Sequence, residues 1–290
     1  MVSDDRGQLI LVGAIAIALV VLGLVLIVNT ALFTQVVGSE GTVESAKEGG
    51  VTGQEVGNAM GAVIAEENPT SSMADSEFDE LNRALANRTL EGSGAFVSLE
   101  YIDSVENGSI IEQDTTGNFT NNNGSGSWDL IRSSKSGDIG KFLVTIDTDS
   151  SSSGTLEIDI AGSSNLDVTV DAGTDEVTID DGSTQCTDIQ ATGNTVRIDV
   201  RHGTVYEDNS CRFDALGGDS PYSVEYSGDL TDVEGTYSIV TNSTVPEDSR
   251  YDDGSDPSVS DAIWSFEYAF TYDSQDATVE SEGRVIDVYD

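Results

Sequence analysis

The chain contains few of the residues on which most catalytic and metal sites depend. His202 is the only histidine, and Cys186 and Cys211 are the only cysteines. A zinc site normally takes four Cys, His or carboxylate ligands, so two cysteines and one distant histidine do not make one. His202 stands in Arg201-His202-Gly203, at the end of a predicted strand, where an exposed turn residue is expected rather than a general base.

Sequence motifs of the common enzyme classes are also missing. The chain has no Gly-x-Ser-x-Gly, no Walker loop, no dinucleotide fingerprint and no His-Glu-x-x-His. Paired carboxylates of the kind used in glycoside hydrolysis stay open as an alternative, because acidic residues occur throughout and none stands out. We therefore expect no enzymatic activity, no metal site and no cofactor, with a surface enzyme as the weakest alternative.

Basic residues are the scarcest charged class. The 290 residues include 12 Lys and Arg against 53 Asp and Glu, a formal net charge of −41. Phosphate binding needs clustered Lys and Arg, so nucleic acid is not an expected partner. The acids are spread among apolar residues, which indicates a folded acidic surface rather than a disordered tail. Such a surface is tolerated where salt screens it and is similar to that of haloarchaeal proteins. An acidic protein from an ordinary organism is the alternative.

Leu9–Val28 is the one long apolar run. Its twenty residues include no charge and no proline. At about 1.5 Å per residue they match the roughly 30 Å hydrocarbon core of a bilayer, so we expect a single membrane-spanning helix. A removed secretory signal usually has an apolar region of about 7–15 residues and a small-residue cleavage site, and this run is longer and lacks that site. We expect a retained anchor that contacts the lipid bilayer.

A short charged leader, Asp4-Asp5-Arg6-Gly7-Gln8, precedes the apolar run directly. This leader and helix resemble the class III, prepilin-type signal of archaeal type IV pilin-like proteins. The whole opening, RGQLILVGAIAIALVV followed by NTALFTQ, is similar to small haloarchaeal membrane proteins of unknown function with pilin-like N-termini. The resemblance covers roughly the first 40 residues.

The resemblance implies how the N-terminus is processed. A prepilin-type peptidase would cut between Gly7 and Gln8 on the cytoplasmic side, and the helix would then pack against other pilin-like subunits. Many pilins carry Glu at the fifth mature position, where this chain has Val12. Arg6 is the only basic residue near the start of the helix, so the positive-inside bias places the N-terminus in the cytoplasm and the C-terminal body outside the cell.

The chain divides into four predicted parts. These are a leader over 1–8, a transmembrane helix over 9–33, a helical neck over 34–94 and a β-rich exterior domain over 95–290. The neck carries a loose apolar stripe between Val43 and Ile64 and a second short helix over Asp75–Leu90. The fold class is α+β, with an antiparallel β-sandwich-like body after the helices.

The hydrophobic period changes to two after Ala95, which indicates strands with one wet face. The polar composition of Val105–Ser127 predicts a long exposed loop that separates the helical part from the β body. The final two strands, joined by Asp-Ser-Gln-Asp, read as a closing hairpin. Strands are predicted over 96–103, 140–147, 155–160, 166–170, 176–180, 196–201, 223–226, 236–240, 263–272 and 278–288.

Cys186 and Cys211 lie 25 residues apart in the predicted exterior domain. An oxidising exterior favours a disulfide between them, and two free thiols are the alternative. Five Asn-x-Ser/Thr sequons predict glycosylation of at least one asparagine. Three of the five lie in the predicted loop. The sequon residues are Asn87, Asn107, Asn118, Asn123 and Asn242.

Carboxylates also gather in three predicted turns. They are Asp147-x-Asp149, Asp180-Asp181-Gly182 and Asp252-Asp253-Gly254-x-Asp256. Hard cations such as calcium prefer oxygen ligands in loops, but none of these clusters has the EF-hand spacing, and we assign no metal site.

Two functions are consistent with the whole pattern. We expect a single-pass, membrane-anchored, pilin-like structural component of the archaeal cell surface. The alternative is a monomeric membrane-tethered binding module or adhesin that uses the loops of its β-sandwich.

Overall fold

The computed structural model describes residues 47, 49–65, 79, 82–83, 87, 95–124, 126–161, 165–218, 220–251, 256–275 and 277–289. The predicted leader and anchor, including Gly7, Gln8 and Leu9–Val28, lie outside these residues. Among the helices that are described, none is long and apolar enough to cross a membrane. The chain divides into two compact units, of which the larger holds Val56–Ala84, Leu99–Ala269 and Ser281–Asp290.

Residues 49–65 form a helix with one buried stripe. Val56, Met60 and Ile64, spaced by four, are at most 5% exposed, as the predicted apolar stripe requires. Val51 and Val63 are apolar residues of the same stretch, but they are 50% and 38% exposed and lie outside the buried stripe. Within the predicted second helix over Asp75–Leu90, the described residues 79, 82, 83 and 87 are helical.

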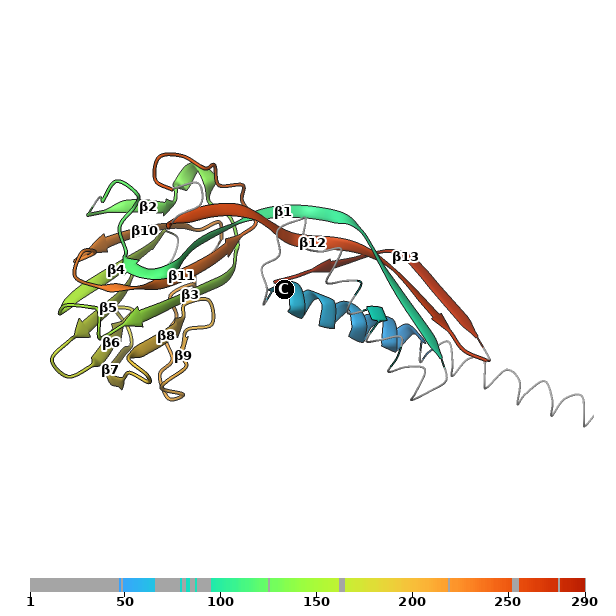
Figure 1. The fold of residues 1–290 in the computed structure, drawn as a ribbon, viewed down its shortest axis with the longest axis horizontal. Helices are drawn as coiled ribbons and strands as arrows, with labels where there is room; N and C mark the ends of the chain where they lie inside the picture. Colours follow the sequence, from blue (N-terminus) through green and yellow to red (C-terminus); the bar gives the residue numbers. More distant parts are fainter. Residues whose placement is uncertain are drawn as a thin grey trace, which may run out of the picture. The chain divides into compact units, whose positions relative to one another are not determined.

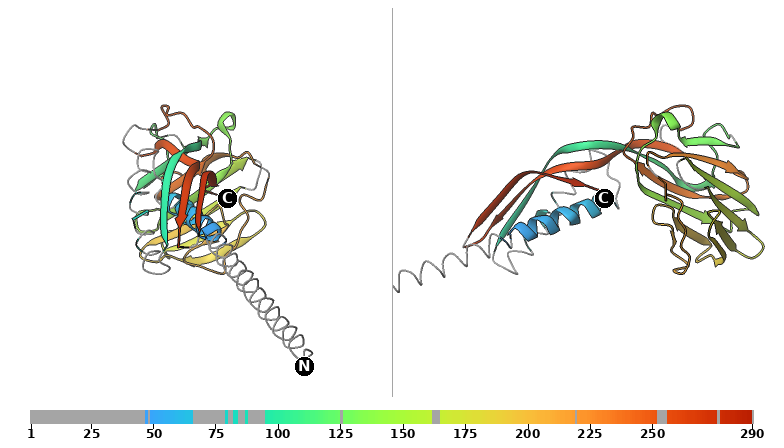
Figure 2. Two further views of the ribbon diagram at one scale, coloured as in Figure 1. Left: turned by 90° about the vertical axis from the view of Figure 1, so that its right-hand side faces the viewer. Right: turned by 180° about the vertical axis from the view of Figure 1, so that it is seen from behind.

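Two antiparallel sheets make up the β body (Figure 1). The seven-stranded sheet has the order β13-β12-β1-β11-β3-β8-β9 and the six-stranded sheet has the order β2-β10-β4-β5-β6-β7. Seen from behind, β1 again lies beside β12, its neighbour in the strand order (Figure 2). The strands are β1 Phe96–Asn118, β2 Trp128–Ile131, β3 Ile139–Asp147, β4 Gly154–Ala161, β5 Leu166–Asp171, β6 Glu176–Asp180, β7 Gln185–Gln190, β8 Thr195–Asp199, β9 Thr204–Val205, β10 Ser223–Gly228, β11 Glu234–Thr241, β12 Ser258–Asp273 and β13 Thr278–Asp287.

The fold confirms the predicted antiparallel, β-sandwich-like architecture, and all ten predicted strands are present. One prediction was wrong. Val105–Ser127 is not a loop along most of its length, because β1 continues to Asn118 and pairs with β11. Ile110 and Ile111 are buried there, and Gln113 takes a buried place opposite Tyr237. The alternation of apolar and polar residues did not predict this part of β1, because the polar residue Gln113, with its hydrogen bonds satisfied, occupies a buried position where an apolar residue is expected.

Gln113 also explains how β1 tolerates an irregular register. Its Nε2 donates to the carbonyl oxygens of Gly117 at 3.0 Å and Gly235 at 2.9 Å. The register between β1 and β11 shifts between Gln113 and Gly117. The side-chain amide therefore replaces the backbone hydrogen bonds that the bulge removes.

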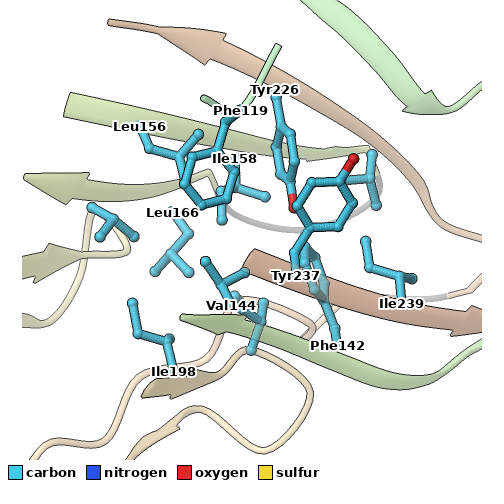
Figure 3. Packing of buried hydrophobic residues seen from close by; sticks show 14 of the residues in the cluster. Phe119, Phe142, Val144, Leu156, Ile158, Leu166, Ile198, Tyr226, Tyr237 and Ile239 are labelled. Carbon is cyan, nitrogen blue, oxygen red and sulfur yellow. The ribbon is translucent and has the colours of Figure 1, made fainter. Parts of the chain in front are cut away.

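The core lies between the two sheets. Phe142 and Val144 of β3 and Ile198 of β8 face Leu156 and Ile158 of β4, and all five are at most 1% exposed (Figure 3). An aromatic group fills one end of this core. The Tyr226 and Tyr237 rings meet edge to face with centroids 5.3 Å apart, and Phe119 packs beside both.

A disulfide joins Cys186 to Cys211, with a Cα–Cα distance of 5.7 Å, and confirms the predicted pair. Cys186 belongs to β7, the last strand of the six-stranded sheet. Cys211 adjoins Arg212, which bridges to Thr204 in β9, the last strand of the other sheet. The bond therefore fastens the two layers together where both sheets end.

Candidate functional site

The turn between β8 and β9 and the segment that follows carry an exposed cationic and aromatic surface. Arg197 of β8 is 57% exposed and its guanidinium lies 4.6 Å from the centroid of the Tyr206 ring, which is itself 51% exposed. Arginine over an aromatic face is held by the ring quadrupole. We call this surface the hairpin patch. Its members are Arg197, Arg201, His202, Tyr206 and Arg212.

Two carboxylates near the hairpin patch, those of Glu207 and Asp199, are largely buried. Glu207 is only 4% exposed, accepts the backbone N–H of Arg197 at 2.7 Å, and pairs with its Nε at 3.3 Å. Asp199 is 14% exposed and accepts the backbone N–H of His202 at 3.0 Å. His202, predicted to be an exposed turn residue, is 71% exposed, and its Nδ1 lies 2.8 Å from the same carboxylate. The patch therefore presents guanidinium and phenol groups to solvent, while its acids are held by their neighbours.

The outer face of the six-stranded sheet has the opposite character. Its six strands contain nine acidic residues and no Lys or Arg. Inner residues of these strands alternate with outer ones, so the acids share the solvent side. We call this surface the acidic face. Its carboxylates are Asp129, Glu157, Asp159, Asp167, Asp171, Glu176, Asp180, Asp188 and Glu225.

Strand register aligns these carboxylates in rows across the sheet. Glu225 of β10 lies opposite Asp129 of β2 on one side and Asp159 of β4 on the other. A second row runs from Glu157 through Asp167 to Asp180 on three successive strands. Neighbouring strands lie about 4.8 Å apart, so like charges face one another at short range.

Asp167 shows the electrostatic cost of this arrangement. Partial burial raises the pKa of its carboxyl group, and the negative charges of Glu157, Asp180 and Asp159 raise it further. The Asp167 carboxyl group is therefore protonated more readily than an isolated one, and a cation placed nearby would offset the repulsion that it feels.

Asp181 differs from its neighbour Asp180. It is 4% exposed, and its carboxylate accepts the backbone N–H groups of Ser183 and Thr184 at 2.9 and 2.6 Å and that of Asp214 at 2.8 Å. Burial raises the pKa of this carboxyl, but the hydrogen bonds outweigh burial and lower the pKa to about 2. Asp181 holds the turn between β6 and β7 against the segment that follows Cys211.

The Asp clusters singled out in the sequence are turn-forming groups where the structure describes them. Asp147 accepts the backbone N–H groups of Asp149 and Ser150, and Asp180 accepts that of Gly182. Asp256 accepts those of Asp114 and Thr115. Asp252 and Asp253 lie outside the described residues. No group of three or more His, Cys, Asp or Glu in the described part of the chain has the geometry to hold a metal ion.

A polar pocket of about 390 Å³ lies beside the irregular end of β1. Its lining consists mostly of residues with amide and hydroxyl side chains, together with Asp256 and Pro257. Several of these amides are engaged, since Gln113 binds two carbonyls and Asn118 donates to the carbonyl of Thr231 at 2.9 Å. The pocket is suited to a small neutral polar ligand rather than to an ion.

The sequon asparagines differ in how their side-chain amides are used. Nδ2 of Asn118 donates to Thr231, that of Asn123 to the carbonyl of Ser249 at 2.8 Å, and that of Asn242 to the Asp138 carboxylate at 3.1 Å. Asn107 is exposed on β1 and Asn87 is exposed. Glycosylation replaces a hydrogen on Nδ2. A glycan on the exposed residues Asn107 or Asn87 would therefore disturb the fold less than one on the other three asparagines, whose Nδ2 atoms donate hydrogen bonds.

The sequence predictions did not identify the hairpin patch or the rows of the acidic face. Three of the twelve basic residues, Arg197, Arg201 and Arg212, fall within sixteen positions, and this clustering was the available signal. Comparison with known proteins adds no relative, since no family model, no curated protein and no solved structure matches the chain.

Proposed function

We propose that this chain is a membrane-anchored, pilin-like structural component of the archaeal cell surface. One observation carries the proposal. The leader Asp4-Asp5-Arg6-Gly7-Gln8 directly precedes the uncharged run Leu9–Val28, in the order that a prepilin-type peptidase recognises. Cleavage between Gly7 and Gln8 leaves the apolar helix on the mature chain, where it is held in the bilayer or packs with other subunits.

The character of the β body supports an exterior location. Disulfides persist in oxidising compartments, and the Cys186–Cys211 bond joins the ends of both sheets. A surface with net charge −41 and an acidic face without Lys or Arg is suited to a medium of high ionic strength. A β-sandwich on a single anchor is a suitable exterior part for a structural subunit.

The mature N-terminus tests the proposal. Mass spectrometry of the native protein, from membranes and from material sheared off the cell surface, should find a chain that starts at Gln8 in both fractions. Gly7→Val should block processing and remove the protein from the sheared fraction, and Ser3→Ala, which changes the leader away from the cut, should leave both unchanged. An intact leader confined to the membrane would contradict the proposal.

A second function, a membrane-tethered binding module or adhesin, is favoured by the polar pocket beside β1. Its amides and hydroxyls suit an uncharged, hydroxyl-rich ligand such as a neutral saccharide. Glycan-array binding by the full chain, lost in Thr116→Trp at the pocket wall and kept in an unprocessed Gly7→Val chain, would favour this function over the structural one.

A further inference from the structure

We propose that the hairpin patch of one copy docks onto the acidic face of a second copy. This inference rests on the proposed function, in which many copies share one surface layer. The contact joins two different surfaces of the same chain, so each copy offers one of each to its neighbours. Such a heterologous contact repeats from copy to copy unless the rotation closes a ring.

The composition of the hairpin patch is that of an interaction hot spot. Arginine and tyrosine are the residues that most often dominate binding energy when a partner covers them. Tyr206 is among the few large hydrophobic side chains that are half exposed in the described chain. Arg201 is exposed and forms no ion pair with any described carboxylate. Its guanidinium is therefore available to a partner without breaking an existing bond.

The acidic face supplies what this patch lacks. Its rows place carboxylates on adjacent strands, about 4.8 Å apart, and a guanidinium can bridge two such groups through its planar set of donors. Next to the second row, on the side away from the first, Thr155 and Thr169 lie side by side with their hydroxyls 3.0 Å apart. The threonines offer methyl groups and hydroxyls against which an exposed tyrosine can pack.

Docking of a cationic patch would reduce the repulsion between neighbouring carboxylates on the acidic face. The pKa of Asp167 is raised by burial and by Glu157, Asp180 and Asp159. An arginine placed beside Asp167 lowers the repulsion between it and these three carboxylates. The six strands of the same sheet contain no Lys or Arg that could do this, so a basic group beside Asp167 comes from outside these strands.

Salt affects the contact in two opposite ways. Two copies with net charge −41 repel one another over about 10 Å at 0.1 M salt, and over only about 3 Å at 1 M. Direct guanidinium–carboxylate contacts act within the shorter range. Docking is therefore expected to strengthen from 0.1 M to 1 M salt, unlike a simple attraction between opposite charges.

A charge swap tests the contact. The full chain in detergent micelles at 1 M KCl is examined by sedimentation velocity over a range of concentrations. Wild type should form a concentration-dependent series of species larger than dimers. Arg201→Glu/Arg212→Glu and, separately, Asp159→Arg/Asp167→Arg should each weaken association at least about tenfold. An equimolar mixture of the two variants should restore species beyond the dimer, because the altered patch of one variant meets the altered face of the other and the two unaltered surfaces meet as in wild type.

Controls separate the contact from net charge and from folding. Lys135→Glu and Asp149→Lys make charge changes of the same sign and half the size at exposed residues outside both surfaces, and they should associate like wild type. Circular dichroism checks that each variant keeps its β structure. If a double variant fails to fold, Arg201→Gln and Asp167→Asn replace it, with a smaller weakening expected.

The outcomes are decisive in each direction. Restoration in the mixture supports the contact. Variants that associate like wild type, or a mixture that stops at the dimer, overturn it. Wild type that stays single at 1 M KCl but binds a sulfated polysaccharide through Arg201 also overturns it, because the partner is then another polyanion. If the mature chain starts at Gln8 but the copies do not make this contact, the proposed function stands and only the contact is overturned. If the copies make the contact but the leader is not cleaved, only the proposed function is overturned.

Discussion

Asp181 and Asp214, 33 residues apart, are joined by a hydrogen bond of 2.8 Å from the backbone N–H of Asp214 to the Asp181 carboxylate. The bond links the β6–β7 turn to the segment that follows Cys211. The disulfide joins the neighbouring strand β7 to the same segment. One disulfide and one hydrogen bond therefore hold the edge that carries the hairpin patch.

The Asp181 attachment should depend on pH. Its folded pKa of about 2 lies below the ordinary value of 3.8, so the ionised group stabilises the fold above about pH 4. That contribution, about 2 kcal/mol at 1.36 kcal/mol per pKa unit, is lost as the pH falls through 2. Asp181→Asn should lower the free energy of unfolding by roughly 1–2 kcal/mol at pH 7, because the amide oxygen is a weaker hydrogen-bond acceptor than the carboxylate. At pH 2 the same substitution should lower it by much less. Urea denaturation at both pH values measures this, and an equal loss at both would contradict it.

The disulfide should stabilise the folded chain chiefly by restricting the unfolded one. Closing a loop of 25 residues contributes about 3–4 kcal/mol on a chain-entropy estimate. Cys186→Ser/Cys211→Ser should show this loss in urea denaturation. Reducing agent should lower the stability of wild type toward that of the double variant and leave the double variant unchanged. Wild type that is insensitive to reduction would show that the bond carries little of the stability.

Asp167 should destabilise the sheet at low salt. Its raised pKa means that the protonated group is favoured in the fold, so its charge opposes folding at neutral pH and stability rises as the pH falls toward that pKa. Asp167→Asn is expected to raise the free energy of unfolding by about 0.5 kcal/mol, the range of a cross-strand pair, at 0.1 M KCl and by less at 2 M. Thermal unfolding at both concentrations measures the difference. Asp149→Asn is the matched control, and an equal gain in that loop variant would assign the effect to net charge alone.

Glycosylation should favour Asn107 over three of the other sequons. Asn107→Gln should remove a glycan mass that Asn118→Gln, Asn123→Gln and Asn242→Gln leave in place, because the amide nitrogens of those three donate hydrogen bonds in the fold. Intact-mass spectrometry of the protein from its native host measures the change. A glycan on Asn242 would require the loss of its bonds to Asp138 and would count against this ranking.

Much of the fold could be predicted from alternation alone. Within β4, β5, β6 and β8, apolar and polar residues alternate, and the predicted strands agree with the observed ones to within two residues. β7, which lies in the same stretch of the chain, was not predicted. The same rule failed in β1, because Gln113 occupies a buried position and its neighbours are polar. Short strands at sheet edges, such as β9 with two residues, carry too little pattern to be recognised.

The hairpin patch and the acidic face could not be predicted from composition, because they depend on the register in which the strands pair. The sequence showed many acids, but only the pairing of Glu225 with Asp129 and Asp159 places three carboxylates in one row. Likewise, the sequence shows that three arginines are clustered, but only the structure shows that the Glu207 side chain, which pairs with Arg197, is buried while the arginine is exposed. Long-range pairing decides which side chains meet, and a single sequence leaves it open.

The distribution of arginine also determines how the chain meets a protease. Trypsin cuts after Lys and Arg, and there are none between Lys141 and Arg197 or between Arg212 and Arg250. Its accessible sites in this half of the molecule therefore gather at the hairpin patch. A cut after Arg201 falls inside the loop closed by Cys186 and Cys211, so the two pieces stay covalently joined. The nicked protein would migrate as one species until the disulfide is reduced, and adhesion of a neighbour to the patch would slow the cut.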